Sequence, residues 1–373
     1  MLAGAPVEMT TSLRKIRQRR HTSRSGGRSG GGAVLGEDAL IARIRRGIPS
    51  SAGGILRLAI GDDAAILRLR RGREWVVTCD QFIEDVHFVK ALHPPEVVGY
   101  KALARATSDL AAMGAVPRVF LLSLALPASC AGVWLTAMTH GMARAAREFG
   151  LTLAGGDTAR SPAQNAAVTL NLTVLGEIEA GRGVRRNSAL PDDAIFVTGV
   201  LGAAQLGLEI VLRGWAGSYR RLVAPHFYPK PCLEVGRWLL RRRIASAMMD
   251  LSDGLSTDLA RLCRASGVGA RLHESAIPRV AVPAALRRKL QAKGAKRSRA
   301  KVFEERELAL HGGEDYGLLF TVRKRMVSRV PAAFHGTRIT RIGEMVSGGG
   351  VVLIGADGSA RSLTPGGWDH FRD

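Results

Sequence analysis

The pattern of apolar and polar residues predicts both strands and helices along the whole chain. The clearest strand covers residues 168–174, where Val168, Leu170, Leu172 and Val174 alternate with polar residues, so one face must be buried. Residues 74–82, "EWVVTCDQF", and residues 118–126, "RVFLLSLAL", are also predicted strands. Because strands and helices mix in both halves and no short internal repeat is found, the predicted class is α/β (α+β).

Helical periodicity is strongest in residues 93–115, with prolines at the entry and Gly114 at the exit, and it places Asp109 near the helix end. A second helix is predicted at residues 131–149 and ends at Gly150. Further along, we expect a strand in "AIFVTG" and a helix from about Gly202. The remaining predicted elements are helices near 232–243 and 255–266 and strands near 317–323 and 350–354.

The chain has 373 residues, which is long enough for two domains with large cores. The stretch "EAGRGVRRNSALPDD" has the glycine, proline and charge of a linker. The predicted division is therefore a basic arm at residues 1–33, an N-terminal domain at 34–178 and a C-terminal domain at 179–373.

The longest apolar stretch begins at Val119 and is about half as long as a membrane-spanning helix. Neither a membrane span nor a secretory signal is predicted, so we expect a cytoplasmic protein. The four cysteines (Cys79, Cys130, Cys232 and Cys263) form no C-x-x-C pair, which indicates buried thiols rather than a zinc site or disulfides.

Lysine and arginine outnumber aspartate and glutamate by 54 to 32, for a net charge of +22. Such a charge favours nucleic acid, membrane surfaces or phosphorylated small molecules without choosing among them. Residues 1–33 are typical of a disordered arm, with a transit peptide or an overextended start as alternatives. Residues 287–301 are typical of a solvated insertion, with a binding surface as the alternative.

The aspartates are concentrated in short segments. Ten of the sixteen fall in "GDDAA", "TCDQFIEDVHF", "TSDLAAMGA", "AGGDTAR", "MMDLSDGLSTDL" and "HGGEDYG". Most adjoin predicted strand ends or glycine turns, where a side chain can point into a cleft. Acids that converge on one pocket repel each other unless cations neutralise them, and oxygen ligands without cysteine or clustered histidine favour Mg²⁺. Bound Mg²⁺ would turn the acidic pocket into a receptor for a polyphosphate.

Each acid also has a structural interpretation. Asp62, Asp192 and Asp193 suit turns, and Asp258 suits an exposed or capping position in a helix. Asp250 and Asp253 have the best local geometry for one ion, because a strand end followed by a turn lets carboxylates three apart bracket it. Taken together, metal binding is favoured for Asp63, Asp80, Asp109, Asp157, Asp250 and Asp253.

The usual phosphate-binding motifs are missing from the sequence. It contains neither G-x-x-x-x-G-K-[ST] nor the protein-kinase set, and "TGVLGAAQLG" is too loose for a dinucleotide fingerprint. If ATP binds, metal ions and backbone next to glycines must hold its phosphates, with help from Arg160 or Arg186.

Six segments in order resemble the thiamine-monophosphate kinase family of the aminoimidazole ribonucleotide synthetase-like superfamily. They are "GDDAAIL", "TCDQFIEDVHF", "YKALARATSDLAAMGA", "AGGDTARSP", "DLSDGLSTDL" and "HGGEDYGLLFTV". The resemblance implies a two-domain synthetase-like fold, with an N-terminal sheet domain that pairs in a homodimer and a C-terminal α/β domain. It implies transfer of the γ-phosphoryl group of ATP to thiamine monophosphate, with several Mg²⁺ ions.

The resemblance also implies roles for particular residues. The implied Mg²⁺ ligands are Asp63, Thr78, Asp80, Asp109, Asp157, Asp250 and Asp253. The implied ATP contacts are Gly156, Asp157, Arg186 and Ser252. The implied contacts to thiamine monophosphate are His87, Glu314 and Trp368, for which spacing alone gives structural roles to His87 and Trp368 as alternatives.

Four positions depart from the family pattern: Cys79, Asp85, Ala106 and Gly317. They bear on substrate affinity more than on the reaction. Another ATP-using enzyme of the superfamily, such as aminoimidazole ribonucleotide synthetase or selenophosphate synthetase, is one alternative. A nucleic-acid-binding protein that uses the +22 charge is a second, although the resemblance leads us to expect no membrane and no specific nucleic acid as a partner.

Overall fold

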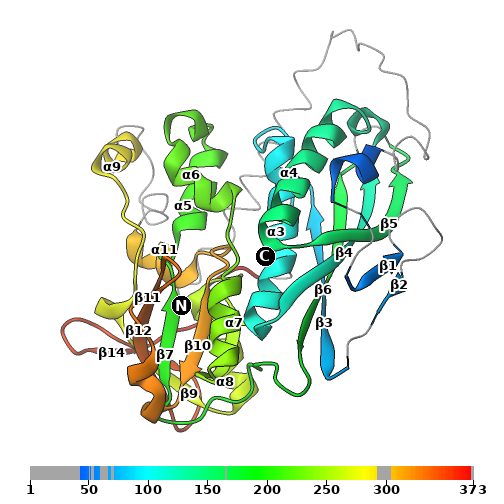
Figure 1. Ribbon diagram of the computed structural model, residues 1–373. Helices are drawn as coiled ribbons and strands as arrows, with labels where there is room; N and C mark the ends of the chain where they lie inside the picture. Colours follow the sequence, from blue (N-terminus) through cyan, green and yellow to red (C-terminus); the bar gives the residue numbers. More distant parts are fainter. Residues whose placement is uncertain are drawn as a thin grey trace.

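A computed structural model describes residues 43–49, 51, 54–58, 66–68, 71–163, 166–291 and 304–370. Two sheets with their helices lie side by side, and helix α3 runs between them (Figure 1). The elements of the first half are β1 (Leu56–Leu58), β2 (Ile66–Leu67), β3 (Arg73–Ile83), α3 (Pro95–Met113), β4 (Val116–Leu126), α4 (Val133–Phe149), β5 (Thr152–Arg160) and β6 (Thr169–Glu179).

The second half contains seven strands of the larger sheet's path, a short strand beside it, and six helices among the described residues. The strands are β7 (Ala194–Thr198), β8 (Ala245–Asp250), β9 (Gly269–His273), β10 (Leu318–Val322), β11 (Ala333–Phe334), β12 (Thr337–Val346), β13 (Val351–Ile354) and β14 (Ala360–Ser362). The helices are α5 (Ala203–Leu212), α6 (Arg220–Phe227), α7 (Leu233–Arg241), α8 (Leu255–Ser266), α9 (Ala284–Gln291) and α11 (Glu305–His311).

The first sheet has the strand order β3-β6-β4-β5 within the described residues. The alternation in β6 puts Leu170, Leu172 and Val174 into a core that also contains residues of α3 and α4. Because period-two alternation sends successive side chains to opposite faces, the polar residues of β6 face the other side of the sheet. The prediction of one buried face is confirmed.

Helices α3 and α4 pack closely because glycines stand at their contact. A Cβ at Gly99 would lie 1.9 Å from the carbonyl oxygen of Met138, and one at Gly141 would lie 1.9 Å from that of Glu96. Helix α3 ends where Gly114 takes a left-handed φ of 71°, a conformation that costs glycine little. This packing fixes the position of the polar residues on α3.

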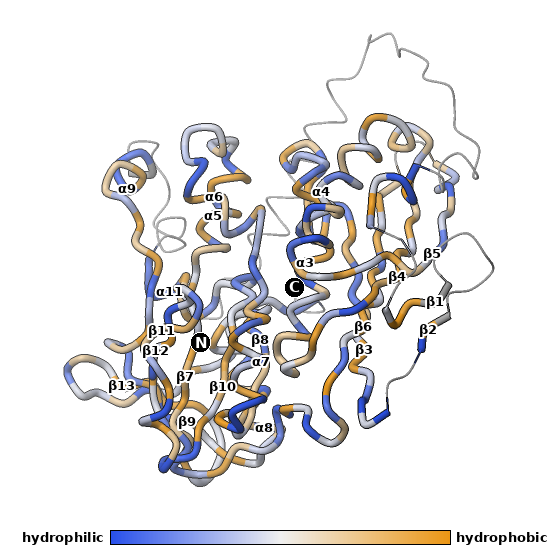
Figure 2. Tube along the Cα trace, in the orientation of Figure 1, coloured by the Kyte–Doolittle hydropathy of each residue, from blue (hydrophilic) through white to orange (hydrophobic). Residues whose placement is uncertain are grey.

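The larger sheet has the order β14-β13-β9-β12-β7-β10-β8, with β11 paired to β12. Its central strands β7 and β10 are buried along their whole length and are mostly apolar (Figure 2). Strand β8 is at the edge of this order, where it packs against α3. The last residue of β8, Asp250, therefore meets the first half of the molecule.

The predicted strands and helices are confirmed with small shifts of their ends, and the additional elements are α6, α9, α11, β1, β2, β5, β9, β11, β12 and β14. Two expectations about burial are wrong: Cys79 is exposed on a strand at a sheet edge, and Asp258 is buried rather than exposed. Residues 287–291 continue α9, whereas the rest of the 287–301 segment and the whole 1–33 arm lie outside the described residues. The domain boundary near residue 178 stays a prediction.

In the part of the chain that the structure covers, no helix is both long and apolar enough to cross a membrane.

Candidate active site

Three predicted carboxylates come together where α3 meets both sheets. Asp80 comes from β3, Asp109 from α3 and Asp250 from the end of β8. The hydroxyl of Thr78 donates a hydrogen bond to Asp109, and the hydroxyl of Ser108 donates one to Asp250. Consecutive residues of α3 thus tie β3 to β8, which brings side chains about 170 residues apart in the sequence into one site.

The carboxylates of this group repel one another. Burial raises the pKa of Asp250 to about 8, and the charges of Asp109 and Asp80 add to the shift. The pKa of Asp109 is also raised, first by burial and then by Asp80, while the hydrogen bond from Thr78 opposes the shift. Such mutual repulsion is what a bound cation would relieve.

Asp253 lies in the turn after β8 and forms an ion pair with Arg261 of α8. Arg261 also pairs with Asp258 at 3.0 Å, and Asp258 accepts the backbone N–H of Asp253 at 3.0 Å. Asp258 therefore holds the turn before α8 from inside the fold. Its hydrogen bond to the N–H of Asp253 agrees with the predicted capping role. Burial raises its pKa to about 7, with a further contribution from Asp253.

Glu314 stands beside this group, next to a buried lysine and a buried histidine. It accepts a hydrogen bond of 2.7 Å from Lys101, which is fully buried, and its Oε2 is 3.1 Å from His226 Nδ1. Burial alone would raise the pKa of Glu314, but Lys101, His226 and Arg105 outweigh it and hold the pKa well below its ordinary value. Glu314 is therefore a fixed negative charge at neutral pH.

The "HGGEDYG" segment is held by its backbone against the turn after β8. The N–H of Glu314 donates to the carbonyl of Ser252 at 2.8 Å, and Glu314 has a left-handed φ of 66°. A Cβ at Gly313 would lie 2.7 Å from the same carbonyl, so only glycine permits this approach. The neighbouring Asp315 accepts the N–H groups of Gly202 and Ala204 and so caps α5.

The C-terminal segment brings Trp368 to the same place. Its backbone N–H donates to the carbonyl of Asp253 at 3.0 Å, and its ring lies 5.5 Å from that of His370. The His370 ring is in turn 5.3 Å from that of His87. Burial, followed by the charge of Arg105, lowers the pKa of His87 to about 3, so His87 is neutral at pH 7. The structure therefore brings His87, Glu314 and Trp368 to one side of the acid group.

The predicted ATP residues are more dispersed. Gly156 and Asp157 are exposed on β5, and Arg186 is exposed in the segment between β6 and β7. Among the described residues, no hydrogen bond or ion pair joins the side chain of Asp157 or Arg186 to the acid group, and Ser252 contributes its backbone carbonyl. Asp63 lies outside the described residues.

The four departures from the family pattern have clear local settings. Asp85 has a left-handed φ of 65°, a conformation that favours glycine, and Ala106 is buried in α3. A Cβ at Gly317 would lie 2.9 Å from the carbonyl oxygen of Thr198, which explains the glycine there. Cys79 points to the outer face of β3, where its thiol is 3.0 Å from Asn171, away from the buried core.

Sequence reasoning missed Lys101, Arg105, His226 and Arg261. Lys101 and Arg105 precede Asp109 at four-residue spacing on a strongly predicted helix, so all three project from one face. Two cations in line with a predicted metal ligand were a usable signal. For His226, no local signal exists, because its partners come from distant segments.

The described residues contain no group of three His, Cys, Asp or Glu side chains placed to hold a metal ion. The donor chemistry nevertheless fits Mg²⁺, because Mg²⁺ takes one or two carboxylates and completes its shell with water and substrate phosphates. Asp80, Asp109 and Asp250 offer oxygen ligands and gain by neutralisation.

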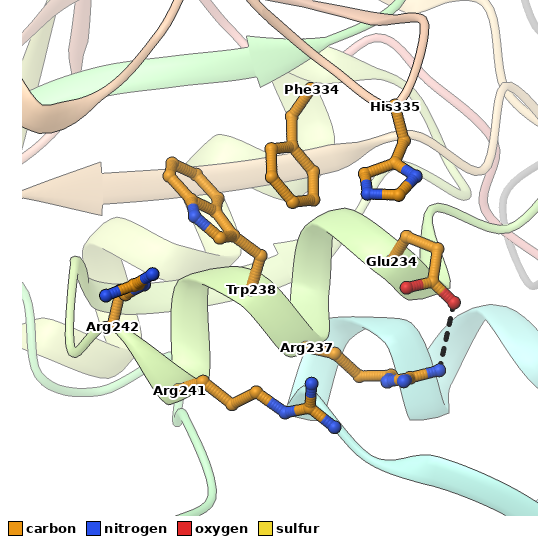
Figure 3. A pocket seen from close by; sticks show the side chains of 7 residues that line it. All are labelled: Glu234, Arg237, Trp238, Arg241, Arg242, Phe334 and His335. Carbon is orange, nitrogen blue, oxygen red and sulfur yellow. Dashed lines mark hydrogen bonds and ion pairs between the residues drawn. The ribbon is translucent and has the colours of Figure 1, made fainter.

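A pocket of about 420 Å³ lies elsewhere, between α7 and the turn from β11 to β12 (Figure 3). The rings of Trp238 and Phe334 stack at 4.7 Å, and Arg237 pairs with Glu234. Arg241, Arg242 and His335 complete the lining, which includes none of the predicted site residues.

Comparison with known proteins agrees with this architecture. Residues 61–178 match the family described as AIR synthase related protein, N-terminal domain, and residues 191–356 match the corresponding C-terminal domain. Thiamine-monophosphate kinase from Bacillus subtilis (strain 168) is 34% identical over 81% of this chain and 89% of its own length. The enzyme of that name from Escherichia coli (strain K12) is 34% identical over 91% of this chain and 99% of its own.

A solved structure of AaThiL complexed with AMPPCP and TMP is 30% identical and covers 92% of this chain and 100% of that chain, with a TM-score of 0.68. The two family matches cover both halves of the chain, and the chain spans most of the length of these relatives. The chain belongs to the thiamine-monophosphate kinase family of AIR synthase related proteins.

Proposed function

We propose that this protein transfers the γ-phosphoryl group of ATP to thiamine monophosphate, giving thiamine diphosphate and ADP. The observation that carries the proposal is the single site in which Asp80, Asp109 and Asp250 adjoin the fixed carboxylate of Glu314. Family membership supports it, and the AaThiL structure contains an ATP analogue together with TMP. The chain would divide into domains at 34–178 and 179–373, with the site between them.

The substrate's cationic thiazolium suits Glu314, which Lys101 and His226 keep ionised and in place. Trp368 offers an aromatic face to the same cation, and His87 offers a neutral ring nitrogen. These three residues would orient thiamine monophosphate with its phosphate toward the acid group. Gly156, Asp157, Arg186 and Ser252 would hold ATP.

The chemical step breaks the bond between the γ-phosphorus and the bridging oxygen of ATP and forms a bond from that phosphorus to an oxygen of the acceptor phosphate. The acceptor monoester is largely dianionic at pH 7, since its second pKa is about 6, so no general base is needed. The residues must instead hold two anions in line. We propose that Asp63, Thr78, Asp80, Asp109, Asp157, Asp250 and Asp253 hold Mg²⁺ ions, which would neutralise the phosphate charge when bound.

We also propose a homodimer formed through the outer face of the β3-β6-β4-β5 sheet. Val77 and Leu121 are 59% and 36% exposed on this face, and Cys79, two residues after Val77, is aligned with Leu121 through Thr173 of β6. Leu56 and Leu67 of β1 and β2 cover part of this face, where they pack with Val119, Ala154 and Leu175. The apolar groups that stay exposed beside them support a partner surface. A cytoplasmic location is proposed because the reaction uses ATP and the four cysteines are unpaired.

The proposal is tested by replacing Asp80 or Asp253 with asparagine, which keeps the size but removes the charge. We expect ADP formation with thiamine monophosphate and Mg²⁺ to fall at least about a hundredfold in each variant, because the phosphates lose their cation support. Asp357→Asn, in an exposed turn, is the matched control and should keep full activity. Full activity of either site variant, with an unchanged unfolding transition, would refute the assigned roles.

A further inference from the structure

Arg105 is a buried cation whose hydrogen bonds are incomplete. It lies on α3, one turn before Asp109, and its side chain is 12% exposed. Its Nε and Nη1 atoms are buried and have no hydrogen-bond partner within the described residues. A buried guanidinium without acceptors is costly, because the group gives up its hydration without replacement.

The surroundings of Arg105 keep it charged. Burial opposes its charge, but Tyr316, Asp80, Glu314 and Asp253 outweigh that effect and raise its pKa. The nearest carboxylate oxygen, Oδ2 of Asp80, is 3.5 Å from Nε, which makes an ion pair but not a hydrogen bond. The ring of Phe82 lies 5.3 Å below the guanidinium and supports it from one side.

Arg105 interacts with both parts of the site. Its Nε is 3.5 Å from Oδ2 of Asp80 in the acid group, and the charge of Glu314, one of the proposed contacts to thiamine monophosphate, also acts on it. Oε2 of Glu314 accepts from Lys101 and lies 3.1 Å from His226, and Nε and Nη1 of Arg105 find no acceptor among the described residues. A ligand that carries oxygen acceptors can satisfy these donors.

A phosphate monoester has the right chemistry for this position. The planar fork of arginine matches two phosphate oxygens, and such charge-assisted contacts are stronger than those between neutral groups. If Glu314 contacts the cationic end of the acceptor, the phosphate at the other end would lie toward Asp80 and next to Arg105. We propose that Arg105 binds the phosphate of the acceptor substrate and so distinguishes phosphorylated from unphosphorylated thiamine. This inference rests on the proposed function and adds a specificity residue to it.

A different role would be purely structural, in which Arg105 only neutralises Asp80. The two roles differ in what they change. If Arg105 contacts the phosphate, its loss weakens the binding of thiamine monophosphate alone. If Arg105 only neutralises Asp80, its loss changes the Mg²⁺ concentration that the activity requires.

The test uses the full chain and the variants Arg105→Met and Arg105→Lys. Binding of thiamine monophosphate, thiamine and ATP is measured by titration calorimetry, and KM and kcat are measured with Mg²⁺ varied. We expect Arg105→Met to weaken the binding of thiamine monophosphate about tenfold to a hundredfold, which is the range for losing a hydrogen bond to a charged group. The affinities for thiamine and ATP and the half-saturating Mg²⁺ concentration should change less than about twofold. Arg105→Lys keeps the positive charge but lacks the planar fork, so its affinity for thiamine monophosphate should lie between those of the wild type and Arg105→Met.

The control is Arg144→Met, which removes an arginine that stacks on Tyr100 and Tyr228 in the same half of the molecule. It should leave all of these constants unchanged. If Arg105→Met does not fold, as thermal unfolding would reveal, Arg105→Lys and Arg105→Gln carry the comparison. An unchanged affinity of Arg105→Met for thiamine monophosphate overturns the inference, whether or not the Mg²⁺ dependence changes. In that case wild-type turnover still supports the proposed function. A wild-type protein that does not phosphorylate thiamine monophosphate overturns both.

Discussion

At the scale of single residues, the site is defined by how buried charges are matched. Asp250 and Asp109 have raised pKa values because burial disfavours ionisation, and a nearby carboxylate adds to the shift: Asp109 for Asp250, and Asp80 for Asp109. Glu314 has the opposite behaviour because Lys101 and His226 surround it. Buried carboxylates of one site thus differ in charge preference: the aspartates favour the protonated form unless a cation joins them, whereas Glu314 stays ionised.

The buried histidines give the protein a predicted sensitivity to acid. His93 and His226 lie with their Nε2 atoms 3.0 Å apart, and burial is the main cause that lowers their pKa values to about 3 and 4. In the unfolded chain, each has a pKa near 6.5 and binds a proton as the pH falls. The folded state does not, so the free energy of unfolding decreases from about pH 6.5 down to about pH 4.

The expected decrease is about 1.4 kcal/mol per pH unit for each histidine in this range. Urea unfolding at pH 7, 6 and 5 measures it. His93→Gln should make the decrease shallower, and His140→Gln, an exposed position on α4, should leave it as in the wild type. An equal slope for His93→Gln and the wild type would show that the buried pair does not titrate on unfolding.

At the scale of elements, most strands and helices were predictable because they have their own local signals. Helix α3 combines helical periodicity with prolines at one end and Gly114 at the other, and β6 alternates without a break. Short elements such as α6 and α11 were missed, since their burial depends on neighbours that are distant in the sequence. Asp258 was misjudged for the same reason: spacing suggested solvent, but the fold turns it inward toward Asp253.

The candidate site shows where such reasoning stops. The acids were found from their concentration next to glycine turns, and resemblance supplied their roles. The cations were not found, because the importance of Lys101 follows from its distance to Glu314, 213 residues later in the chain. Only the packing of α3 between the two sheets creates that contact.

At the scale of the whole molecule, the open face of the first sheet predicts self-association. Replacing Val77 and Leu121 together with aspartate should convert a dimer into a monomer, because charges on a buried apolar surface are costly. Sedimentation equilibrium at micromolar concentration measures the mass. Val133→Asp, which changes an 87% exposed residue at the start of α4, is the control and should remain dimeric. A wild-type monomer, or a dimer in the double variant, would contradict this interface.

The central claim is direct transfer between two phosphorylated substrates held in one site, and isotope transfer tests it most directly. The protein is incubated with Mg²⁺, thiamine monophosphate and ATP labelled in its γ-phosphate, and the products are separated. We predict that the label appears in the terminal phosphate of thiamine diphosphate, in equal amount to the ADP formed, and that omitting thiamine monophosphate abolishes ADP formation. Unlabelled thiamine diphosphate, release of the label as free phosphate, or no turnover would contradict the account.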